Sequence, residues 1–512
     1  MPTAATPNPT VLQPPEPRAE RGNTAVRRDL WIGFVLVAVV IVCRFWLADV
    51  LPLTDTTEAR FAEIARKMVE TSDWLVPQHD YGVPYLAKPP LAFWLSAVGI
   101  ELFGAGELGP RILILGAALA FCGLFFYWTN KLFGLVAAAA SLMMLMTSVV
   151  FFIAMAAVMT DMLLTVCVCT ALIAFWWRYQ AGSAGWEAAM YVAIGLGLLA
   201  KGPLAAVLVF APILGWSLAT GRYREVWQRF AWIKGALLVG VVAVPWYIAA
   251  ELRNPGFLQY FLIGEHVGRF IVPGWSGDLY GRAHDAPRGA IWIFWLVGML
   301  PWSLLFIPVL RSGKAVVRRN WVERRDLLWF LFAWALTPLV LFTCSANIIF
   351  PYVLPAVPAA VVALVALRAG PPESTFTLLR MSWVGVFVVA AIVVFVMVDR
   401  DVVEQHTQRS VIAAVRLRDE QPGIPIYYWR SRYYSADYYS AGATSTIGDP
   451  ELLAALSEQR AFALVVTDEQ LQAFPAAMAA RLVRVANVGD FTVLEPEYLI
   501  RFSSAVLRRS FP

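Results

Sequence analysis

The chain is poor in charged residues. Only 15% of its 512 residues are Asp, Glu, Lys or Arg, whereas 59% are hydrophobic, and a soluble domain carries about 25% charged residues. Its mean hydropathy is +0.63. This composition excludes an ordinary soluble protein and predicts a polytopic α-helical membrane protein embedded in a lipid bilayer.

Lysine, histidine and cysteine are also scarce. Arginine carries most of the net charge of +5, because the chain has only six lysines. This modest balance requires no nucleic acid as a partner, since cytoplasmic loops of membrane proteins collect Lys and Arg anyway. The cysteines are odd in number and fall in apolar segments, so neither a disulfide framework nor a zinc site is expected. They are Cys43, Cys122, Cys167, Cys169 and Cys344.

Long hydrophobic runs, by contrast, are abundant. A helix needs roughly 20 apolar residues to cross a bilayer, with a lower limit near 17. We therefore expect about eleven spans in a transmembrane domain over residues 30–398, preceded by a disordered cytoplasmic tail over 1–29. The expected spans are 30–50, 111–129, 132–152, 161–178, 186–200, 203–219, 231–251, 289–310, 327–345, 349–367 and 381–398.

The charges between the spans predict their orientation. Loop 51–110 holds more acidic than basic residues, whereas 311–326 holds six basic residues and two acidic ones. Because Lys and Arg gather on the cytoplasmic side, we expect a cytoplasmic N-terminus and a large periplasmic first loop. Stretch 89–104 would reach only about 24 Å as a helix, short of the roughly 30 Å hydrocarbon core. We therefore interpret it as an interfacial helix.

The composition changes after residue 398. Alternating strands and helices there predict a small α/β domain over 399–512, on the same side as the first loop. The expected strands are 424–429, 461–466, 482–487 and 490–495, and the expected helices are 409–420, 450–460 and 468–480.

The first loop begins with charged side chains. Apolar residues at helical spacing predict an amphipathic helix over 57–71 on the bilayer surface. Asp55 and Glu58 at its start fit a capping box, and they equally fit a pair of carboxylates acting as base and electrostatic anchor. The two interpretations are compatible, because a cap fixes a carboxylate in place. Arg60 either pairs with one of them or binds substrate.

Three further ionisable residues lie at the ends of apolar segments. Lys88 precedes two prolines, and it either snorkels towards lipid headgroups or meets a phosphate in a partly desolvated pocket. Asp161 opens a span, as an N-cap or as a functional group at membrane depth. Lys201 ends another span in the same outer layer. Tyr85 is typical of a substrate-binding residue and equally of an aromatic belt.

The later outer loops supply weaker candidates. Arg253, His266 and Arg269 lie in loop 252–288 and fit either solvated loop charges or ligands for phosphate and sugar. Tyr352 stands at the outer start of a proline-rich span, as a substrate-binding residue or an interface anchor.

Taken together, these residues resemble the polyprenyl-phosphate-dependent GT-C glycosyltransferases. The chain looks most like the branch that contains protein O-mannosyltransferases and the bacterial aminoarabinose transferase that modifies lipid A. The resemblance spreads over about residues 30–365. Its stretches are Asp55-x-x-Glu58-Ala-Arg60-Phe-Ala-Glu-Ile, Gly-Val-Pro-Tyr85-x-x-Lys88-Pro, Asp161, Lys201-Gly-Pro, Glu265-His266-x-x-Arg269-Phe, Met-Leu-Pro301-Trp302 and Tyr352-x-Leu-Pro355.

The resemblance implies a bacterial inner-membrane enzyme that inverts the sugar it transfers and uses no nucleotide sugar. Its donor would be an undecaprenyl-phosphate-linked sugar of the aminoarabinose kind, and its acceptor lipid A or another periplasmic molecule. Asp55 then matches the catalytic acid, Lys88 the ligand of the donor phosphate, Tyr85 a cavity residue and Asp161 a second outer carboxylate. We expect a monomer that requires no cofactor and no metal.

Two departures leave the sugar and the acceptor open. Ala87 replaces the glutamate that usually precedes Lys-Pro, and Ser345-Ala-Asn347 lacks a usual lysine. The alternatives are a protein O-mannosyltransferase-like enzyme and, outside the enzymes, a polyprenyl-lipid flippase or transporter. A transporter carries charged or broken helices near the bilayer midplane, often in paired halves. Here the candidates gather at one face, which favours an enzyme.

Overall fold

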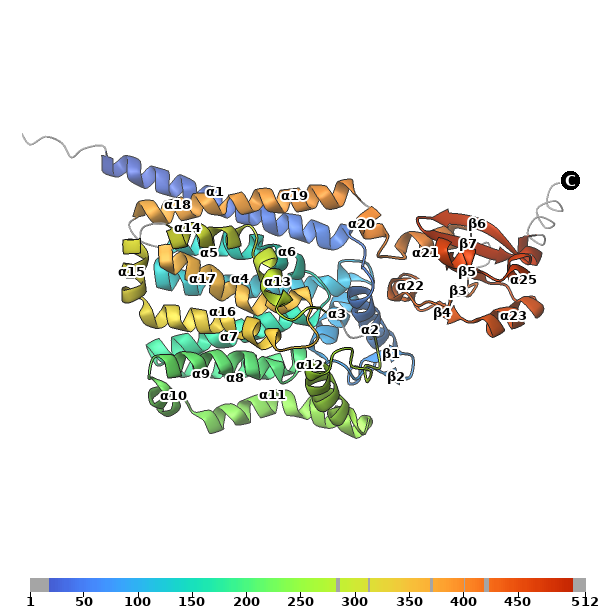
Figure 1. The fold of residues 1–512 in the computed structure, drawn as a ribbon, viewed down its shortest axis with the longest axis horizontal. Coiled ribbons are helices and arrows are strands. Elements are labelled where there is room, and N and C mark those ends of the chain that lie inside the picture. Colours follow the sequence, from blue (N-terminus) through green and yellow to red (C-terminus); the bar gives the residue numbers. More distant parts are fainter. Residues whose placement is uncertain are drawn as a thin grey trace, which may run out of the picture.

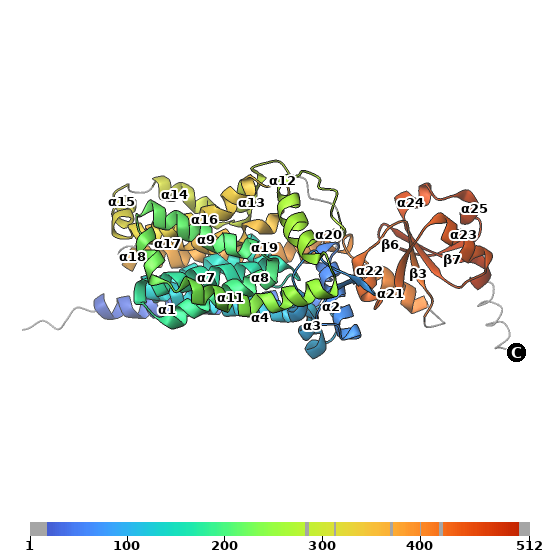
Figure 2. The ribbon, with the colours of Figure 1, turned by 90° about the horizontal axis from the view of Figure 1, so that it is seen from below.

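The computed structural model of the chain describes residues 18–281, 286–311, 314–368, 372–399, 401–418 and 423–500. A bundle of long helices forms its larger part, and a smaller sheet domain lies at one end of the bundle (Figures 1 and 2). Of the tail expected over 1–29, residues 1–17 lie outside the described residues, and the rest continues as the first turns of a helix.

The helices of the bundle differ widely in length. Most are apolar, as the sequence predicts. They are α1 (Arg18–Val50), α2 (Thr57–Thr71), α3 (Leu91–Phe103), α4 (Gly109–Phe133), α5 (Leu135–Thr147), α6 (Val149–Ala154), α7 (Thr160–Ala181), α8 (Ala184–Lys201), α9 (Leu204–Ala219), α10 (Tyr223–Arg229), α11 (Trp232–Arg253), η1 (Gln259–Gly268), α12 (Arg269–Ile271), α13 (Ala290–Gly298), η2 (Trp302–Leu305), α14 (Phe306–Arg311), α15 (Lys314–Glu323), α16 (Arg325–Thr343), η3 (Phe350–Ala356), α17 (Val357–Arg368), α18 (Pro372–Ser382) and α19 (Val384–Val398).

Seven helical segments in the described part of the chain are long and apolar enough to cross a membrane, or eight if one bent pair counts as a span. The seven are 26–50, 109–133, 160–181, 232–253, 325–343, 350–368 and 375–398. They confirm the expected polytopic helical fold. The remaining four expected spans correspond to α5 with α6, to α8, to α9 and to the bent pair.

Two of these four are interrupted inside an apolar run. The expected span 132–152 divides at Ser148, whose backbone is extended (φ −65°, ψ 128°). The expected span 289–310 bends by 97° between Ala290–Gly298 and Trp302–Pro308. Pro301 has no amide hydrogen for a helical bond, so the helix ends before it. Apolar composition alone therefore does not distinguish a continuous span from a broken one.

The first loop packs closely against the bundle. Its helix α2 has the bounds expected from the sequence, and the short strands β1 (Gln78–Asp80) and β2 (Val83–Pro84) pair antiparallel beyond it. Both faces of α2 are covered, so that even Glu63 and Lys67 are almost inaccessible. The expected capping box is not formed, because the N-cap is Thr56 and its side chain makes no capping bond.

The C-terminal domain is built on a five-stranded sheet in the order β4-β3-β5-β7-β6. Strands β4, β3 and β5 run parallel, and β7 and β6 complete the sheet in antiparallel fashion. Its elements are α20 (Asp401–Glu404), α21 (Arg409–Arg418), β3 (Ile426–Trp429), α22 (Tyr434–Tyr439), β4 (Thr444–Ile447), α23 (Asp449–Ser457), β5 (Ala463–Thr467), α24 (Asp468–Gln472), α25 (Ala476–Ala479), β6 (Leu482–Val488) and β7 (Phe491–Pro496).

Both faces of this sheet are covered. In β5, Leu464 and Val466 belong to one apolar cluster, and Ala463 and Val465 belong to another on the opposite face, as the alternation of side chains along a strand requires. The expected strands and the expected helices 409–420 and 450–460 are present near their predicted positions, whereas the expected helix 468–480 is divided into α24 and α25. The sequence predicts neither β4 nor the short helices α20 and α22.

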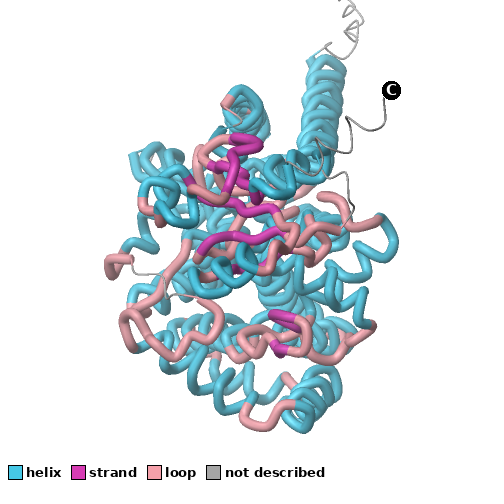
Figure 3. The backbone as a smooth tube through the Cα atoms, turned by 90° about the vertical axis from the view of Figure 1, so that its right-hand side faces the viewer, coloured by secondary structure: helices cyan, strands magenta, loops and turns pink. Residues whose placement is uncertain are grey.

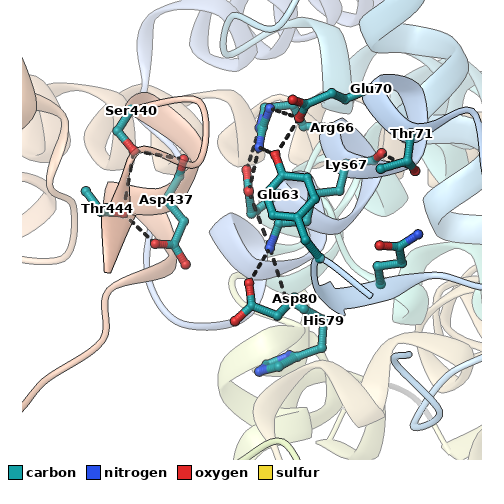
Figure 4. A network of polar contacts seen from close by, with 12 residues as sticks. Glu63, Arg66, Lys67, Glu70, Thr71, His79, Asp80, Asp437, Ser440 and Thr444 are labelled. Atoms are coloured by element: carbon teal, nitrogen blue, oxygen red, sulfur yellow. Dashed lines mark hydrogen bonds and ion pairs between the residues drawn. The ribbon is translucent and has the colours of Figure 1, made fainter. Parts of the chain in front are cut away.

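Helix α22 lies between the sheet and the first loop (Figure 1), and Figure 3 shows the strands of the sheet, in magenta, in front of the helices of the bundle. Polar groups of the two parts face each other there (Figure 4), and Arg432 links them. Arg432 binds Asp80 of the loop at 3.0 Å and Asp437 of α22 at 3.0 Å. On the loop side, Arg66 forms a bidentate pair with Glu63, at 2.7 and 2.8 Å. The C-terminal domain is therefore docked on the first loop.

Candidate functional site

A cavity of about 660 Å³ lies where the first loop meets the outer ends of several spans. Four cations and three carboxylates line it, so its lining carries one net positive charge apart from histidine. The charged residues are Arg60, Lys88, Lys201, Arg269, Asp161, Glu265 and Asp278. Apolar residues from α9 and α16 form another part of the wall, including Leu204, Val207 and Leu341.

Lys88 lies at the centre of the first charged group in the cavity. Its Nζ donates to Glu265 Oε2 at 2.7 Å, and Arg269 Nη1 reaches the same oxygen at 3.2 Å. Arg269 also pairs with Asp278 at 3.3 Å. Burial is the largest single influence on Glu265 and acts to raise its pKa, but the charge and hydrogen bond of Lys88, the charge of Arg269 and the Tyr260 hydroxyl together hold this pKa below its usual value. Glu265 thus stays ionised and orients two cations.

Lys201 and Asp161 form the second charged group. Their side chains are about 9% and 8% exposed, and the Nζ to Oδ1 distance is 2.5 Å. The Lys201 ammonium also lies 4.3 Å from the ring centre of Tyr352, within the range of a cation–π interaction. The sequence predicts all three residues as candidates, and the fold brings them together.

His266 lies beside the end of α8. Its Nδ1 is 2.8 Å from the Phe261 carbonyl and its Nε2 is 3.2 Å from the Lys201 carbonyl. Burial lowers its pKa. Gly202 makes this approach possible, because a Cβ there would lie 2.9 Å from His266 Nε2 and the residue has φ +72°. The Lys201-Gly-Pro motif therefore includes a glycine required by packing.

An aromatic group forms the wall nearest the first loop. Tyr85 is almost fully buried, and its ring centre is 4.6 Å from that of Tyr280. Burial raises its pKa. Arg60 stacks over Tyr85 at 5.7 Å and over Tyr434 of the C-terminal domain at 5.5 Å. Its Nη1 donates to the Tyr280 carbonyl at 2.6 Å, and the expected pairing with Asp55 or Glu58 is absent among the described contacts.

Asp55 contacts the C-terminal domain. Its Oδ1 accepts the Ser435 backbone N–H at 3.1 Å, and its Oδ2 accepts the Ser435 hydroxyl. Burial raises the pKa of Asp55 to about 6, against the lowering effect of these hydrogen bonds. Asp55 is not among the residues that line the cavity, although its neighbours Thr56 and Thr57 are.

Two other predicted site residues point elsewhere. Glu58 forms a bidentate pair with Arg111, at 2.9 and 2.8 Å. Burial is the largest single influence on Glu58 and acts to raise its pKa, but the charge and hydrogen bonds of Arg111, the Val158 N–H and the charge of Arg44 together lower this pKa. Arg253 pairs with Asp73 at 2.9 Å and is more than half exposed. Neither residue lines the cavity.

Some cavity residues escaped the sequence prediction. Tyr434 lies in a helix that the sequence does not predict. Glu265, by contrast, belongs to the Glu265-His266-x-x-Arg269 motif and to the charged residues of loop 252–288 that are candidate ligands for phosphate and sugar. Asn347 lies in the stretch that lacks the usual lysine. Its Nδ2 donates to the Val272 carbonyl at 3.3 Å, and this bond connects loop 252–288 to the segment between α16 and η3. Within the described residues, no three His, Cys, Asp or Glu side chains gather as metal ligands.

Comparisons with known proteins agree with this architecture. Residues 87–248 match the family described as dolichyl-phosphate-mannose-protein mannosyltransferase. The undecaprenyl phosphate-alpha-4-amino-4-deoxy-L-arabinose arabinosyl transferase of Edwardsiella ictaluri is 30% identical over 307 residues, which are 58% of this chain and 52% of that protein. A second such transferase, from Sodalis glossinidius, is 32% identical over 333 residues, 62% of this chain and 56% of that protein.

The matched segment thus spans about half the length of these curated relatives. Among solved structures, ArnT from Cupriavidus metallidurans bound to undecaprenyl phosphate is similar over 91% of this chain and 98% of that chain, with a TM-score of 0.73 and 20% identity. Its apo form gives a TM-score of 0.72. These matches confirm the predicted resemblance and the fold of a membrane glycosyltransferase of the GT-C type.

Proposed function

We propose that the chain is a glycosyltransferase that moves a sugar from a polyprenyl-phosphate donor to an acceptor at the periplasmic face of the inner membrane. The observation that carries this proposal is the mixed character of the cavity. Fixed cations lie at one side, and apolar residues of membrane helices lie at the other. Val207 lines the cavity and is 43% exposed on the surface of the bundle. A lipid with an anionic head fits both parts.

The cations are suited to the phosphate of such a donor. When the bond from the sugar to the phosphate breaks, the electron pair stays on the phosphate oxygen, and fixed positive charges stabilise the negative charge that develops. Lys88 is a point charge held by Glu265, and Arg269 adds a planar fork of donors beside it. Arg60 Nε is buried without a hydrogen-bond partner among the described residues, and a bound anion would satisfy it.

The transfer step requires an acceptor oxygen to attack the anomeric carbon from the face opposite the phosphate, which inverts its configuration. Where the acceptor is a hydroxyl, Asp55 accepts its proton. Where it is a phosphate of lipid A, the acceptor is already anionic, and Asp55 orients it or stabilises positive charge on the sugar. Asp161, Lys201 and Tyr352 line the same cavity as a second charged group near Lys88.

We assign the donor as an undecaprenyl-phosphate-linked sugar of the aminoarabinose kind and the acceptor as lipid A. The support is the identity of about 30% to transferases with that donor in their names. The match of residues 87–248 to protein mannosyltransferases favours a protein acceptor as the second candidate. The enzyme acts as a monomer in the bacterial inner membrane, with its cavity and C-terminal domain in the periplasm.

The test uses the full chain in vesicles with a radiolabelled undecaprenyl-phosphate aminoarabinose donor, lipid A and periplasmic protein. We expect label in lipid A. Label in protein instead would support the mannosyltransferase-like activity. Movement of the donor across the bilayer without transfer would support a flippase and overturn the proposal.

Lys88→Ala is the diagnostic variant, with Lys131→Ala as its matched control. Removing the Lys88 charge leaves the donor phosphate without its central cation, so we expect kcat/KM to fall at least about 100-fold, which is roughly 2.7 kcal/mol of transition-state stabilisation. Lys131 lies at the exposed end of α4, outside the cavity, and its replacement should leave kcat/KM within twofold of the parent. Equal activity of the two variants would remove Lys88 from the site.

A further inference from the structure

The start of helix α22 holds the carboxylate of Asp55 from a separate domain. Ser435 contributes both its backbone N–H, 3.1 Å from Oδ1, and its hydroxyl, which bonds Oδ2. The Asp55 backbone N–H in turn donates to the His406 carbonyl at 2.7 Å. Ser435 is completely buried. Both oxygens of one carboxylate are thus bound by one residue that is 380 positions away in the sequence.

The direction of the Ser435 hydroxyl proton is fixed by its surroundings. The Gln408 backbone N–H donates to Ser435 Oγ at 2.9 Å, which makes the serine an acceptor on that side. A hydroxyl has one proton to donate, and an ionised carboxylate only accepts. The proton therefore points to Asp55. Tyr428 supports Gln408 by donating to its Oε1 at 3.0 Å.

The helix that bears Ser435 is itself tied to the first loop on both sides of Asp55. Tyr439 donates to Glu107 at 3.3 Å, and its oxygen accepts the Leu53 N–H at 2.8 Å. Tyr438 donates to the Gly106 carbonyl at 3.0 Å. On the other side, Asp437 and its neighbours face Lys67 and Asp80 (Figure 4). These contacts limit the positions that Ser435 can take.

The residue before Ser435 reaches the cavity itself. Tyr434 lines the cavity beside Arg60, which stacks over its ring, and His79 contacts the same ring at 5.7 Å between centres. Two consecutive residues of the C-terminal domain, Tyr434 and Ser435, thus form part of the cavity wall and hold Asp55.

We propose that Ser435 is a positioning residue for the Asp55 carboxylate and that the C-terminal domain completes the site through Tyr434 and Ser435. This inference rests on the proposed function, because it assumes that Asp55 acts in the transfer. Two hydrogen bonds hold the carboxylate in one orientation beside Thr56 and Thr57 of the cavity wall. Fixing a reacting group in this way lowers the cost of reaching the transition state.

The same hydrogen bonds give the proposal a measurable signature. Burial raises the pKa of Asp55 to about 6, and both Ser435 bonds act to lower it. The other titratable or charged groups near Asp55 are Asp437, Tyr428, Tyr433 and His406 on the C-terminal side and Glu58 and Arg60 on its own side. Because the bonds favour the ionised form, their loss moves the titration of Asp55 to higher pH.

The experiment measures kcat/KM against pH for the full-length protein and for Ser435→Ala, Ser435→Cys and Ser435→Thr. We expect transfer by the parent to decline below about pH 6. In Ser435→Ala this acidic limb of the pH profile, where kcat/KM declines, should shift to higher pH by about one unit, which is the effect of losing one hydrogen bond to a charged group. Ser435→Thr keeps the hydroxyl and should restore the parent profile. Ser435→Cys keeps a weaker donor and should fall between them.

Two controls separate positioning from simple stability. Ser440→Ala removes another buried hydroxyl next to α22, one that bonds Asp437 and Ala443 and not Asp55, so its pH limb should match the parent. His406→Gln should also keep the limb, which excludes histidine as its source. An unchanged limb in both Ser435→Ala and Ser435→Cys would overturn the inference. So would higher activity of Ser435→Ala, which would mean that the domain restrains Asp55. Full transfer by Asp55→Asn would instead defeat the proposed role of Asp55 itself.

Discussion

At the scale of single residues, the charges of the outer face divide into two groups by their partners. Lys88 and Lys201 pair with carboxylates inside the cavity and remain beside open space. Glu58 pairs with Arg111 outside the cavity, and Arg111 also donates to the carbonyls of Ala48 and Pro52. The first group is available to a substrate. The second fastens the start of α2 to the end of α1.

We predict that Glu58→Gln acts on stability. Breaking a buried ion pair leaves the partner charge uncompensated, at a cost of about 3–5 kcal/mol. We expect a clearly lower thermal unfolding midpoint in detergent for this variant. The matched change Glu70→Gln touches a pair with Arg66 whose carboxylate is half exposed, which contributes less than about 1 kcal/mol. A Glu58→Gln protein with the parent unfolding midpoint but no activity would contradict this prediction and would indicate a catalytic role for Glu58.

The sequence predicts which residue types matter, but it does not predict their partners. Lys88 and Asp161 stand out because ionisable groups at the edge of a membrane are costly unless they serve a purpose. Glu265, however, is 177 positions from Lys88, and no local pattern connects the two. The sequence is compatible with Asp55 both as a cap of its own helix and as a functional carboxylate. In the structure it does not cap α2 and bonds to a serine of another domain, a tertiary contact that no local pattern predicts.

At the scale of elements, the close crossing of α3 and α4 depends on missing side chains. A Cβ at Gly99 would lie 2.1 Å from the Gly109 carbonyl oxygen. Small residues at such a crossing allow helices in a membrane to approach closely. Since α3 begins just after Lys88, this crossing also sets the position of the lysine in the cavity.

We therefore predict that Gly99→Ala separates the two helices. Overpacking of this kind costs about 1–3 kcal/mol, so the unfolding midpoint should fall and the KM for the donor should rise. Gly116→Ala in α4 is the matched control, since a Cβ there meets no atom within 4 Å and alanine favours a helix by up to about 1 kcal/mol. Equal unfolding midpoints for the two variants would show that the crossing tolerates a methyl group.

Predictability differs from element to element for physical reasons. The bounds of α2 follow from its helical spacing, and the strands of the C-terminal domain follow from their apolar residues. At the division, only the adjacent hydroxyl residues Thr147 and Ser148 interrupt the apolar run, a signal too weak to predict a break. Helix α22 has only six residues, three of them tyrosine, which is too short for a periodic pattern. Helix α22, which the sequence does not predict, is the element that contacts Asp55.

At the scale of the whole molecule, the two ends of the bundle differ in what they carry. The first loop, the outer helices η1 and α12 and the C-terminal domain lie at one end, and the short helices α10 and α15 lie at the other (Figure 1). Arginines gather at the second end, including Arg222, Arg224 and Arg229 near α10 and Arg318 and Arg319 in α15. Since positive residues accumulate on the cytoplasmic side, this polarity supports the proposed assignment of the cavity to the periplasm.

The last prediction tests that assignment with cysteines at opposite ends. Ser457 lies exposed at the end of α23 in the C-terminal domain, and Ser183 lies exposed between α7 and α8. Both changes are made in a Cys344→Ser background, because Cys344 is exposed. In cells with a permeabilised outer membrane, an impermeant maleimide should label Ser457→Cys at once and Ser183→Cys only after the inner membrane is opened. The reverse pattern would place the cavity on the cytoplasmic side, where it could not meet a lipid A acceptor in the periplasm. A donor presented in the periplasm could then not reach Lys88, so the labelling result bears directly on the proposed transfer.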